Sequence, residues 1–371
     1  MRSNRQAWTK LGIDLVTHDA VLNIVGTSFG ATYLSQNNRP EKMGYFNKVM
    51  SDLHGARILE LMDAQEQGRK VIGTFCVFVP EELIIATNAI SVGLCAGAEL
   101  GFEAAEQFVP RGTCALIKSA FGFNLAKVCP FIEVSDLIVG ENTCDGKKKS
   151  FESYAKIVKN LYVMDLPQMK GESGRTLLNS EYNRFAKQLE ELTGVKITEE
   201  NLSRGIRIVN NKRKALTRLA ALRAANPTPI SGLDVLLINQ IAFLDDPERF
   251  TNAVNELCDE LDERVKNGEG VCDAKTPRIL ISGCPMAIPN WKLPNIIEKS
   301  NAVIIGEEMC TGERGSRNLT AEDAKTKEAM IDAVTDRYFK IDCAVFTPNN
   351  SRLEHIKEMV TKYKADGVIH Y

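Results

Sequence analysis

Apolar residues recur at helical spacing through the first part of the chain. From Met43 to Met62 they lie three or four positions apart, and Gly68 follows as a C-terminal stop signal. This period places them on one face of a helix. We therefore predict that residues 1–69 form a helical N-terminal region.

Short apolar runs alternate with helical patterns over the next hundred residues. The runs are rich in Val, Ile and Leu and read VIGTF, ISVGL, LIVG and LYVM. Helical patterns, such as the one from Arg111 to Val128, separate them. Strands that alternate with helices indicate a parallel sheet with helical crossovers. Residues 70–170 are therefore predicted to form a first α/β domain.

The pattern changes twice in the remainder of the chain. Residues 171–271 carry long amphipathic helical patterns and no strand-like run, which predicts a helical insert or arm. Alternation then resumes over 272–371, where RILISG, VIIGEE and a final DGVIHY are typical of strands. The last run has the composition of a buried parallel strand, although no crossover helix follows to cover it. We predict an α/β fold of two Rossmann-like parallel-sheet domains joined by a long helical segment, with a helical N-terminal extension.

Composition narrows the classes of function. The chain has 371 residues, 44% of them hydrophobic, and a net charge of −2, which offers no broad basic face for nucleic acid. No apolar run approaches the roughly 20 residues that span a bilayer, and the N-terminus lacks the apolar core of a signal peptide. We therefore expect a cytoplasmic protein that binds neither nucleic acid nor membrane. The absence of a GxxxxGK[ST] motif indicates that the chain does not hydrolyse ATP through a P-loop.

The chain contains ten cysteines but only four histidines. Disulfides are disfavoured in a cytoplasmic protein, and without a CxxC pair the common zinc-ribbon and thioredoxin sites are excluded. Ligands bind at the carboxyl ends of strands in open α/β sheets. Five cysteines lie at or just past such an end, namely Cys76, Cys95, Cys144, Cys284 and Cys310. A sixth, Cys114, lies in the first turn of a predicted helix, where the helix dipole favours a thiolate.

Two interpretations of these six cysteines remain open. A single cysteine often fills space in a core. Six that share one position rule favour metal ligation, because soft thiolates select iron–sulfur clusters or zinc. If the two domains face each other, the thiols of both converge on one cleft. The other four are predicted to be structural: Cys258 lies within a helix, and Cys129, Cys272 and Cys343 precede strand-like runs.

Charged residues near these cysteines are weaker candidates. Lys147–Lys149 fit either a site for anionic groups or a solvated helix start. Glu81 and Glu82 suit the first turn of a helix because of its dipole, and their spacing does not support a catalytic role.

These motifs resemble those of a known family. The segments FCVFVPEELI, VGLCAGAE, PRGTCALIKSAFGF, GENTCDGKKK, SGCPM and EEMCTG are similar to the 2-hydroxyacyl-CoA dehydratase D-component family. That family includes benzoyl-CoA reductase and 2-hydroxyglutaryl-CoA dehydratase subunits, and within it the chain most resembles the double-cubane cluster proteins. The similarity covers nearly the whole chain.

The resemblance implies a metal cofactor and its ligands. Family members hold an oxygen-sensitive [4Fe-4S] cluster through cysteines, and double-cubane members hold two sulfide-bridged cubanes, an [8Fe-9S] cluster, through six. Cys114 and Cys144 match the two most typical ligand positions. Cys284 and Cys310 match the additional pair of the double-cubane group, and Cys76 and Cys95 match further cysteines of that group.

The resemblance also implies partners and three functional alternatives. It implies a homodimer that receives low-potential electrons from a separate ATP-hydrolysing iron–sulfur activator and reduces a small-molecule substrate. The alternative is a subunit of a 2-hydroxyacyl-CoA dehydratase, which removes water from its substrate and carries one [4Fe-4S] cluster. The third is a cluster-free, inactive homologue. Family chains continue past the strand that matches DGVIHY and place another cysteine there, so we expect the second domain to be truncated at its C-terminus, Tyr371.

Overall fold

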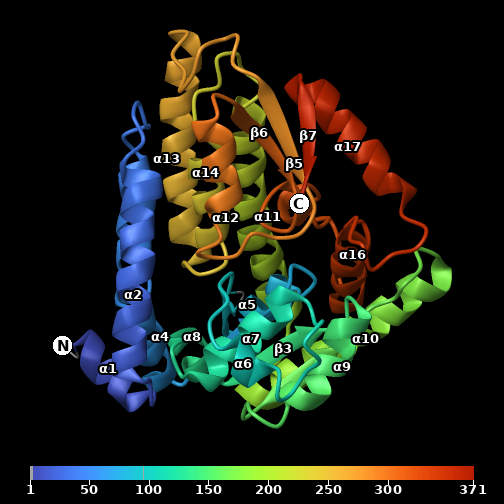
Figure 1. The fold of residues 1–371 in the computed structure, drawn as a ribbon. Coiled ribbons are helices and arrows are strands. Elements are labelled where there is room, and N and C mark those ends of the chain that lie inside the picture. The colour runs from blue at the N-terminus through green and yellow to red at the C-terminus, as the bar shows by residue number, and fades with distance from the viewer. Residues whose placement is uncertain (1–2, 95) are drawn as a thin grey trace.

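The computed structural model describes residues 3–94 and 96–371. The N-terminal region is helical, as predicted, and α2 stands at the outer side of the molecule (Figure 1). Its elements are α1 (Asn4–Lys10), α2 (Leu15–Phe29), the π-helical turn η1 (Gly30–Leu34), α3 (Met43–Ser51) and α4 (Ala56–Glu66). Ser3 and Asp14 cap α1 and α2, because their side chains accept hydrogen bonds from amides of the first turn.

The first parallel sheet has four strands in the order β2-β1-β3-β4. They are β1 (Val71–Thr74), β2 (Ile90–Gly93), β3 (Leu137–Glu141) and β4 (Leu161–Met164). The connecting helices are α5 (Glu81–Ala86), α6 (Phe102–Ala105), α7 (Ala115–Leu125), α8 (Pro130–Val134) and α9 (Asp145–Tyr154). β1 and β3 are buried along their whole length, because their two faces belong to two separate hydrophobic clusters.

The second parallel sheet has three strands in the order β6-β5-β7. They are β5 (Arg278–Ser282), β6 (Val303–Glu308) and β7 (Gly367–His370). The helices of this part are α14 (Lys292–Lys299), α15 (Glu313–Ser316), α16 (Lys327–Phe339) and α17 (Asn350–Tyr363). Figure 1 shows this sheet and α17 above the level of β3 and α9.

Three local predictions are wrong. The final strand is not buried, since β7 forms one edge of its sheet and alternates between half-buried and exposed positions, with Val368 46% exposed. Cys129 does not precede a strand but caps α8, which begins at Pro130. Cys343 lies in the fully described loop between α16 and α17, where no strand follows. Each error involves a short apolar run, whose length does not distinguish a strand from a helical turn or a loop.

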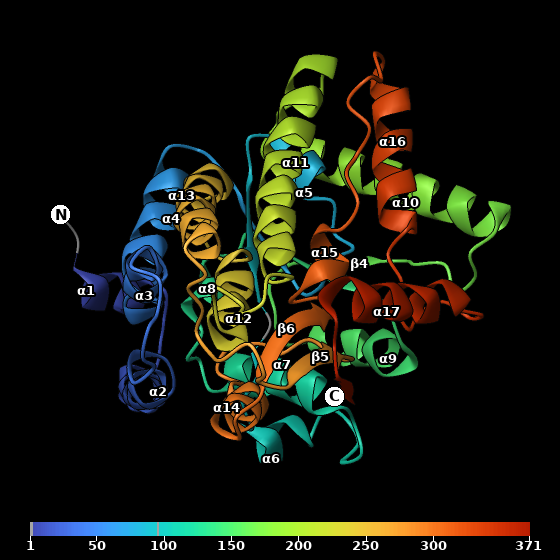
Figure 2. The same cartoon turned by 90° about the horizontal axis from the view of Figure 1, so that it is seen from above.

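Residues 171–271 are helical, as predicted, but they do not extend as a separate arm. The helices are α10 (Glu172–Thr193), α11 (Glu199–Leu222), α12 (Gly232–Ile241) and α13 (Pro247–Lys266). α11 packs against α5 beside the first sheet and against α15 beside the second (Figure 2). α10 packs against α16, and α12 packs against β6 and α14. This helical segment therefore connects the two sheets through its own packing.

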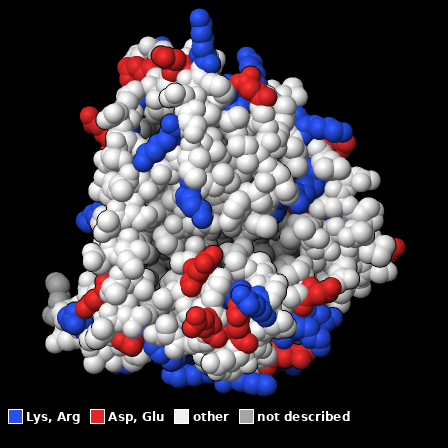
Figure 3. All heavy atoms as spheres, viewed as in Figure 1, with Lys and Arg blue, Asp and Glu red and all other residues white. Residues whose placement is uncertain are grey.

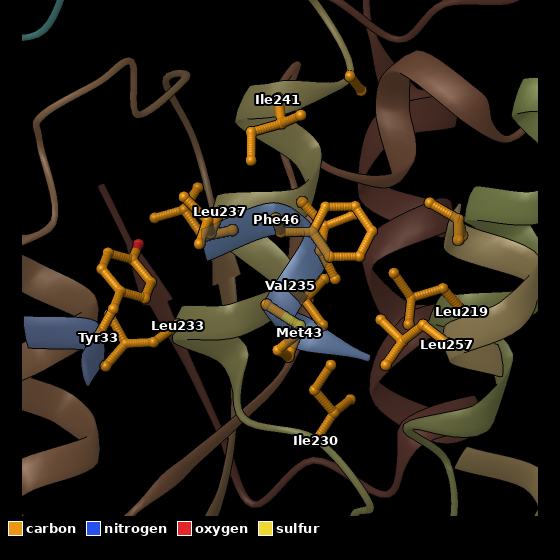
Figure 4. Close-up of a cluster of buried hydrophobic side chains, with 14 of the residues drawn as sticks. Tyr33, Met43, Phe46, Leu219, Ile230, Leu233, Val235, Leu237, Ile241 and Leu257 are labelled. Atoms are coloured by element: carbon orange, nitrogen blue, oxygen red, sulfur yellow. The ribbon is translucent and has the colours of Figure 1, made fainter. Parts of the chain in front are cut away.

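A shared hydrophobic core joins the N-terminal helices to the helical segment. Figure 4 shows Met43 and Phe46 of α3 among Leu219 of α11, Val235 of α12 and Leu257 of α13. All five side chains are at least 98% buried. Burying a large apolar side chain contributes about 1.5–3 kcal/mol. The N-terminal helices are thus an integral part of the core.

The face of the molecule drawn in Figure 3 carries charges of both signs. Figure 3 shows Lys and Arg scattered among Asp and Glu over the face in view. This dispersal agrees with the net charge of −2. None of the described helices has both the length and the apolar composition needed to cross a membrane.

Candidate metal centre

Four of the cysteines predicted to bind metal follow strands, as expected. Cys76 follows β1 and Cys144 follows β3 in the first sheet. Cys284 follows β5 and Cys310 follows β6 in the second. The position rule therefore holds at the carboxyl ends of both sheets.

The other two candidates differ in what can be described. Cys114 was predicted to lie in the first turn of a helix, and it is instead the N-cap residue, immediately before α7 begins at Ala115. Cys95 lies outside the described residues.

Loops from the two sheets meet at these carboxyl ends. The amide of Gly97 donates a hydrogen bond to the carbonyl of Ile288 at 2.9 Å, which joins the loop after β2 to the loop after β5. A Cβ at Gly97 would lie 2.2 Å from the carbonyl oxygen of Ala287, so only glycine permits this approach. The amide of Gly93 also donates to the carbonyl of Phe243, at 2.7 Å.

A hydrogen bond joins two of the proposed ligands, Cys76 and Cys310. The thiol of Cys76 donates a hydrogen bond to the sulfur of Cys310, and both side chains are half-buried. This hydrogen bond, together with burial, raises the pKa of Cys76. The same hydrogen bond lowers the pKa of Cys310 against the opposing effect of burial. The two sheets thus contribute an unequal pair, with Cys310 favouring the thiolate form.

Arg314 supports the sulfur of Cys310. Its Nη1 lies 3.7 Å from Cys310 Sγ, and its Nε donates to Glu308 at 2.8 Å. The buried carboxylate of Glu308 also accepts hydrogen bonds from Arg352 at 3.0 Å and Ser282 at 2.9 Å. The positive charge of Arg314 adds to the lowering of the Cys310 pKa. Sequence reasoning missed Arg314, although its position four residues after a candidate ligand was an available signal.

Glu141 and Lys147 lie on the first-sheet side of the thiol pair. Glu141 ends β3 and is fully buried, and its Oε2 accepts a hydrogen bond from Lys147 Nζ at 3.0 Å. Burial raises the pKa of Glu141, which Lys147 opposes. Lys147 is in α9, and its amide donates to the sulfur of the N-cap Cys144 at 3.4 Å. The first of the three consecutive lysines therefore pairs with an internal carboxylate.

Cys343, predicted to be structural, lies near the thiol pair. Burial raises its pKa, and the charge of Cys76 is the next cause. Cys343 in turn affects the pKa of Cys310. Its carbonyl accepts a hydrogen bond from Asn349 Nδ2 at 2.8 Å, which holds the loop. No local signal in the sequence distinguishes it from a core cysteine.

The remaining candidates are more exposed. Cys114, Cys144 and Cys284 all have exposed side chains. The amide of Cys284 donates to the carbonyl of Tyr371 at 2.9 Å, so the end of β7 fixes this loop. Gly283 precedes it with φ +137°, and a Cβ there would lie 1.9 Å from the same carbonyl oxygen. Only glycine fits this turn.

The type and placement of the ligand side chains determine whether they suit a single metal ion or an iron–sulfur cluster. Within residues 3–94 and 96–371, no group of three or more His, Cys, Asp or Glu converges closely enough to hold a single metal ion. A cluster presents separate irons to separate thiolates, so its ligands need not converge on one point. Thiols at the ends of both sheets, with Arg314 beside one of them, have the chemistry of iron–sulfur ligation. The residues fit a cluster in chemistry and a single ion poorly.

Comparison with known proteins places the chain among dehydratase and reductase subunits by sequence similarity. The family model for the D-component of 2-hydroxyglutaryl-CoA dehydratase matches residues 76–371. The putative dehydratase subunit YjiM of Escherichia coli (strain K12) is 36% identical over 86% of this chain and 82% of that protein. The (R)-phenyllactyl-CoA dehydratase beta subunit of Clostridium sporogenes is 26% identical over 88% of this chain and 84% of that protein. A benzoyl-CoA reductase subunit of Thauera aromatica is 24% identical over 82% of this chain and 78% of that protein.

The matched region starts at Cys76 and contains the other proposed ligands and both loops that carry the thiol pair. The chain belongs to the 2-hydroxyglutaryl-CoA dehydratase D-component family, which confirms the resemblance inferred from its motifs.

Proposed function

We propose that the protein is a cytoplasmic iron–sulfur reductase of this family with a double-cubane [8Fe-9S] cluster. Its proposed ligands are Cys76, Cys95, Cys114, Cys144, Cys284 and Cys310. The observation that supports this proposal best is the hydrogen bond between Cys76 and Cys310, because it brings ligands from two different sheets together. Cysteines 234 positions apart have no local reason to meet.

The residues around the cluster would control its environment. When bound, such a cluster stores and transfers low-potential electrons. Arg314 donates toward the sulfur of Cys310, and hydrogen bonds to ligand sulfurs raise the reduction potential of a cluster. Lys147 neutralises the buried carboxylate of Glu141 beside Cys76, which limits negative charge at the site.

The electrons require a partner, because the chain itself lacks a P-loop. We propose a separate ATP-hydrolysing iron–sulfur activator as the donor and a homodimer as the assembly. Two relatives are named as the beta subunit of a dehydratase and as a subunit of a reductase, and these names support an assembly of several chains. We propose that the chain divides into a helical N-terminal region (1–69), a first α/β domain (70–170), a helical segment (171–271) and a second α/β domain (272–371).

One alternative is supported by the names of relatives. Three of them are called dehydratase or reductase subunits, which suits a 2-hydroxyacyl-CoA dehydratase subunit with one [4Fe-4S] cluster. The double cubane is favoured because Cys284 and Cys310 extend the ligand set to the second sheet.

Anaerobic purification followed by iron and sulfide assays and EPR distinguishes these proposals. About eight irons per chain support the double cubane, and about four support the dehydratase subunit. A fully folded chain without iron, after reconstitution with iron and sulfide, would leave only the cluster-free homologue.

A further inference from the structure

A cavity of about 80 Å³ lies beside the Cys76–Cys310 pair. Both cysteines line it, together with Lys212 and Arg213 of α11 and Arg337 of α16. A buried water needs about 10–15 Å³ on this scale, so the cavity has room for about six water-sized particles. Its wall therefore combines the proposed sulfur ligands with three cationic side chains.

Two of these cations are already neutralised. Lys212 pairs with Glu81, and Arg213 Nη1 lies 2.7 Å from Glu82 Oε1. Both pairs are largely buried, so the opposite charges compensate each other away from water. The lining carboxylate Asp245 is also paired, with a surface arginine of α13. These pairs leave no net charge at the cavity.

Arg337 is different. Its side chain is buried, with 2% of the residue exposed, and it forms no ion pair with a carboxylate in the part of the chain that the structure describes. It donates hydrogen bonds to the carbonyls of Gly315 and Asn318, and its Cζ lies 4.4 Å from the ring centroid of Tyr338. These contacts satisfy donors and give some cation–π attraction. The nearby carboxylate of Glu82 also attracts Arg337, but Glu82 makes its ion pair with Arg213 and none with Arg337.

The surroundings of Arg337 lower its pKa. Burial, and then the nearby charge of Arg213, lower the pKa of Arg337 to about 10. The side chain still carries its charge at neutral pH, because that pKa lies well above 7. A buried cation without a partner is strongly destabilising. Its place on the wall of a cavity indicates that the compensating charge belongs to a bound molecule.

We propose that this cavity binds a small monovalent anion of a few non-hydrogen atoms at Arg337. The size of the cavity suits a carboxylate or oxyanion as small as formate or nitrite. This inference deepens the proposed function and rests on it in one respect: because Cys76 and Cys310 line the same cavity, the anion would lie beside the redox centre. Small anions are then the substrate class of the reductase.

Crystals of the full chain soaked in sodium bromide test the site directly. We expect an anomalous difference peak in the cavity, in contact with the Arg337 guanidinium. Bromide peaks on the surface alone, with none in the cavity, would overturn the proposal. This measurement uses the unmodified chain and does not depend on any variant folding.

Thermal denaturation gives the matched test in solution. We expect formate to raise the Tm by about 1–2 °C near ten times its Kd, with saturation, while benzoate, which is too large for the cavity, has no such effect. Arg337→Met should abolish the formate shift, whereas Arg175→Met, which removes an exposed ion-paired arginine of α10, should retain it. Equal shifts with both anions, or a full shift in Arg337→Met, would contradict the site.

Iron content, assayed on the same preparations, separates this inference from the proposed function. Full iron loading without anion binding would refute the anion site and leave the proposed function intact. Anion binding in a chain that never takes up iron would refute the proposed redox function and support the anion site alone.

Discussion

The hydrogen bond between Cys76 and Cys310 makes two chemically identical side chains unequal. It raises the pKa of the donor, Cys76, and lowers that of the acceptor, Cys310. Arg314 reinforces the difference, because its charge stabilises only the Cys310 thiolate at close range. In the metal-free chain Cys310 is therefore expected to be the more reactive of the two.

Substitution of the hydrogen-bond donor tests this inequality. Cys76→Ala removes the donor and should slow alkylation of Cys310 at pH 7 by about twofold or more, because less thiolate is present. Cys76→Ser keeps a donor at the same place and should react closer to the unmodified chain. Mass spectrometry of iodoacetamide-treated, metal-free protein measures both rates. Equal rates in the Ala and Ser variants would mean that the hydrogen bond does not set the reactivity of Cys310.

Glu298 is a half-buried titrating group outside the candidate metal centre. Its carboxylate accepts hydrogen bonds from the amides of Gly232 at 2.7 Å, Leu233 at 3.3 Å and Ile304 at 3.2 Å, and so caps α12. Burial nevertheless raises the pKa of Glu298 to about 7. In the unfolded chain this group ionises near its usual value of about 4.3. Between these two values the folded state binds more protons, so its stability falls as the pH rises.

Glu298→Gln should flatten this part of the stability profile. Between pH 4.5 and pH 7 the carboxyl group accounts for a loss of at most about 3 kcal/mol, which the neutral amide does not undergo. Urea denaturation at pH 5 and pH 8 measures the difference for both proteins. The prediction fails if the variant and the unmodified chain lose the same stability over that interval.

Among the elements, α11 makes the contacts that hold the two sheets in place. Arg213 of α11 donates to Glu82 of α5 at 2.7 Å and to the hydroxyl of Tyr338 in α16 at 3.0 Å. Tyr338 closes the triangle by donating to Glu82 at 2.8 Å. All three side chains are buried. Glu82, expected only to suit a helix dipole, is thus the partner of a buried arginine.

Breaking this triangle should be costly. Arg213→Met leaves the Glu82 carboxylate buried without its cation, which should destabilise the protein by about 3–5 kcal/mol. The double variant Arg213→Met/Glu82→Gln should recover part of the loss, because no unpaired charge remains. Arg218→Met, which replaces a half-buried arginine of the same helix, should cost less than about 1 kcal/mol. Chemical denaturation of the four proteins checks the order, and a double variant no more stable than Arg213→Met would refute this explanation.

The success of sequence reasoning also varied by element. Strands β1, β3, β5 and β6 were predictable because short runs of Val, Ile and Leu end at glycine or polar residues. α12 was predicted only as part of the helical segment and not as a helix of its own, because all ten of its residues are buried and it has no polar face to give a helical period. β7 was predicted as a strand but not as a half-exposed edge, since edge position depends on the order of strands in the sheet.

For the whole molecule, the rule that ligands bind at the carboxyl ends of parallel strands predicted more of the candidate site than the local sequence pattern did. Because carboxyl ends of parallel strands share one side of a sheet, the rule anticipated that cysteines of both sheets could meet, and Cys76 and Cys310 do. It could not identify Cys343 or Arg337, because their roles depend on how α16 and the following loop pack beside the thiol pair. Such long-range contacts leave no period or spacing in the sequence.

Thiolates from two sheets are proposed to hold one iron–sulfur centre, and the iron content per chain tests this most directly. Iron and acid-labile sulfide should be measured after anaerobic reconstitution of the unmodified chain and of Cys114→Ala, Cys144→Ala, Cys310→Ala and Cys258→Ala. Cys258 is buried within α13, away from the strand ends, and serves as the matched control. We predict that the first three variants lose iron and that Cys258→Ala keeps it. Equal iron in all four variants and the unmodified chain would contradict the assignment.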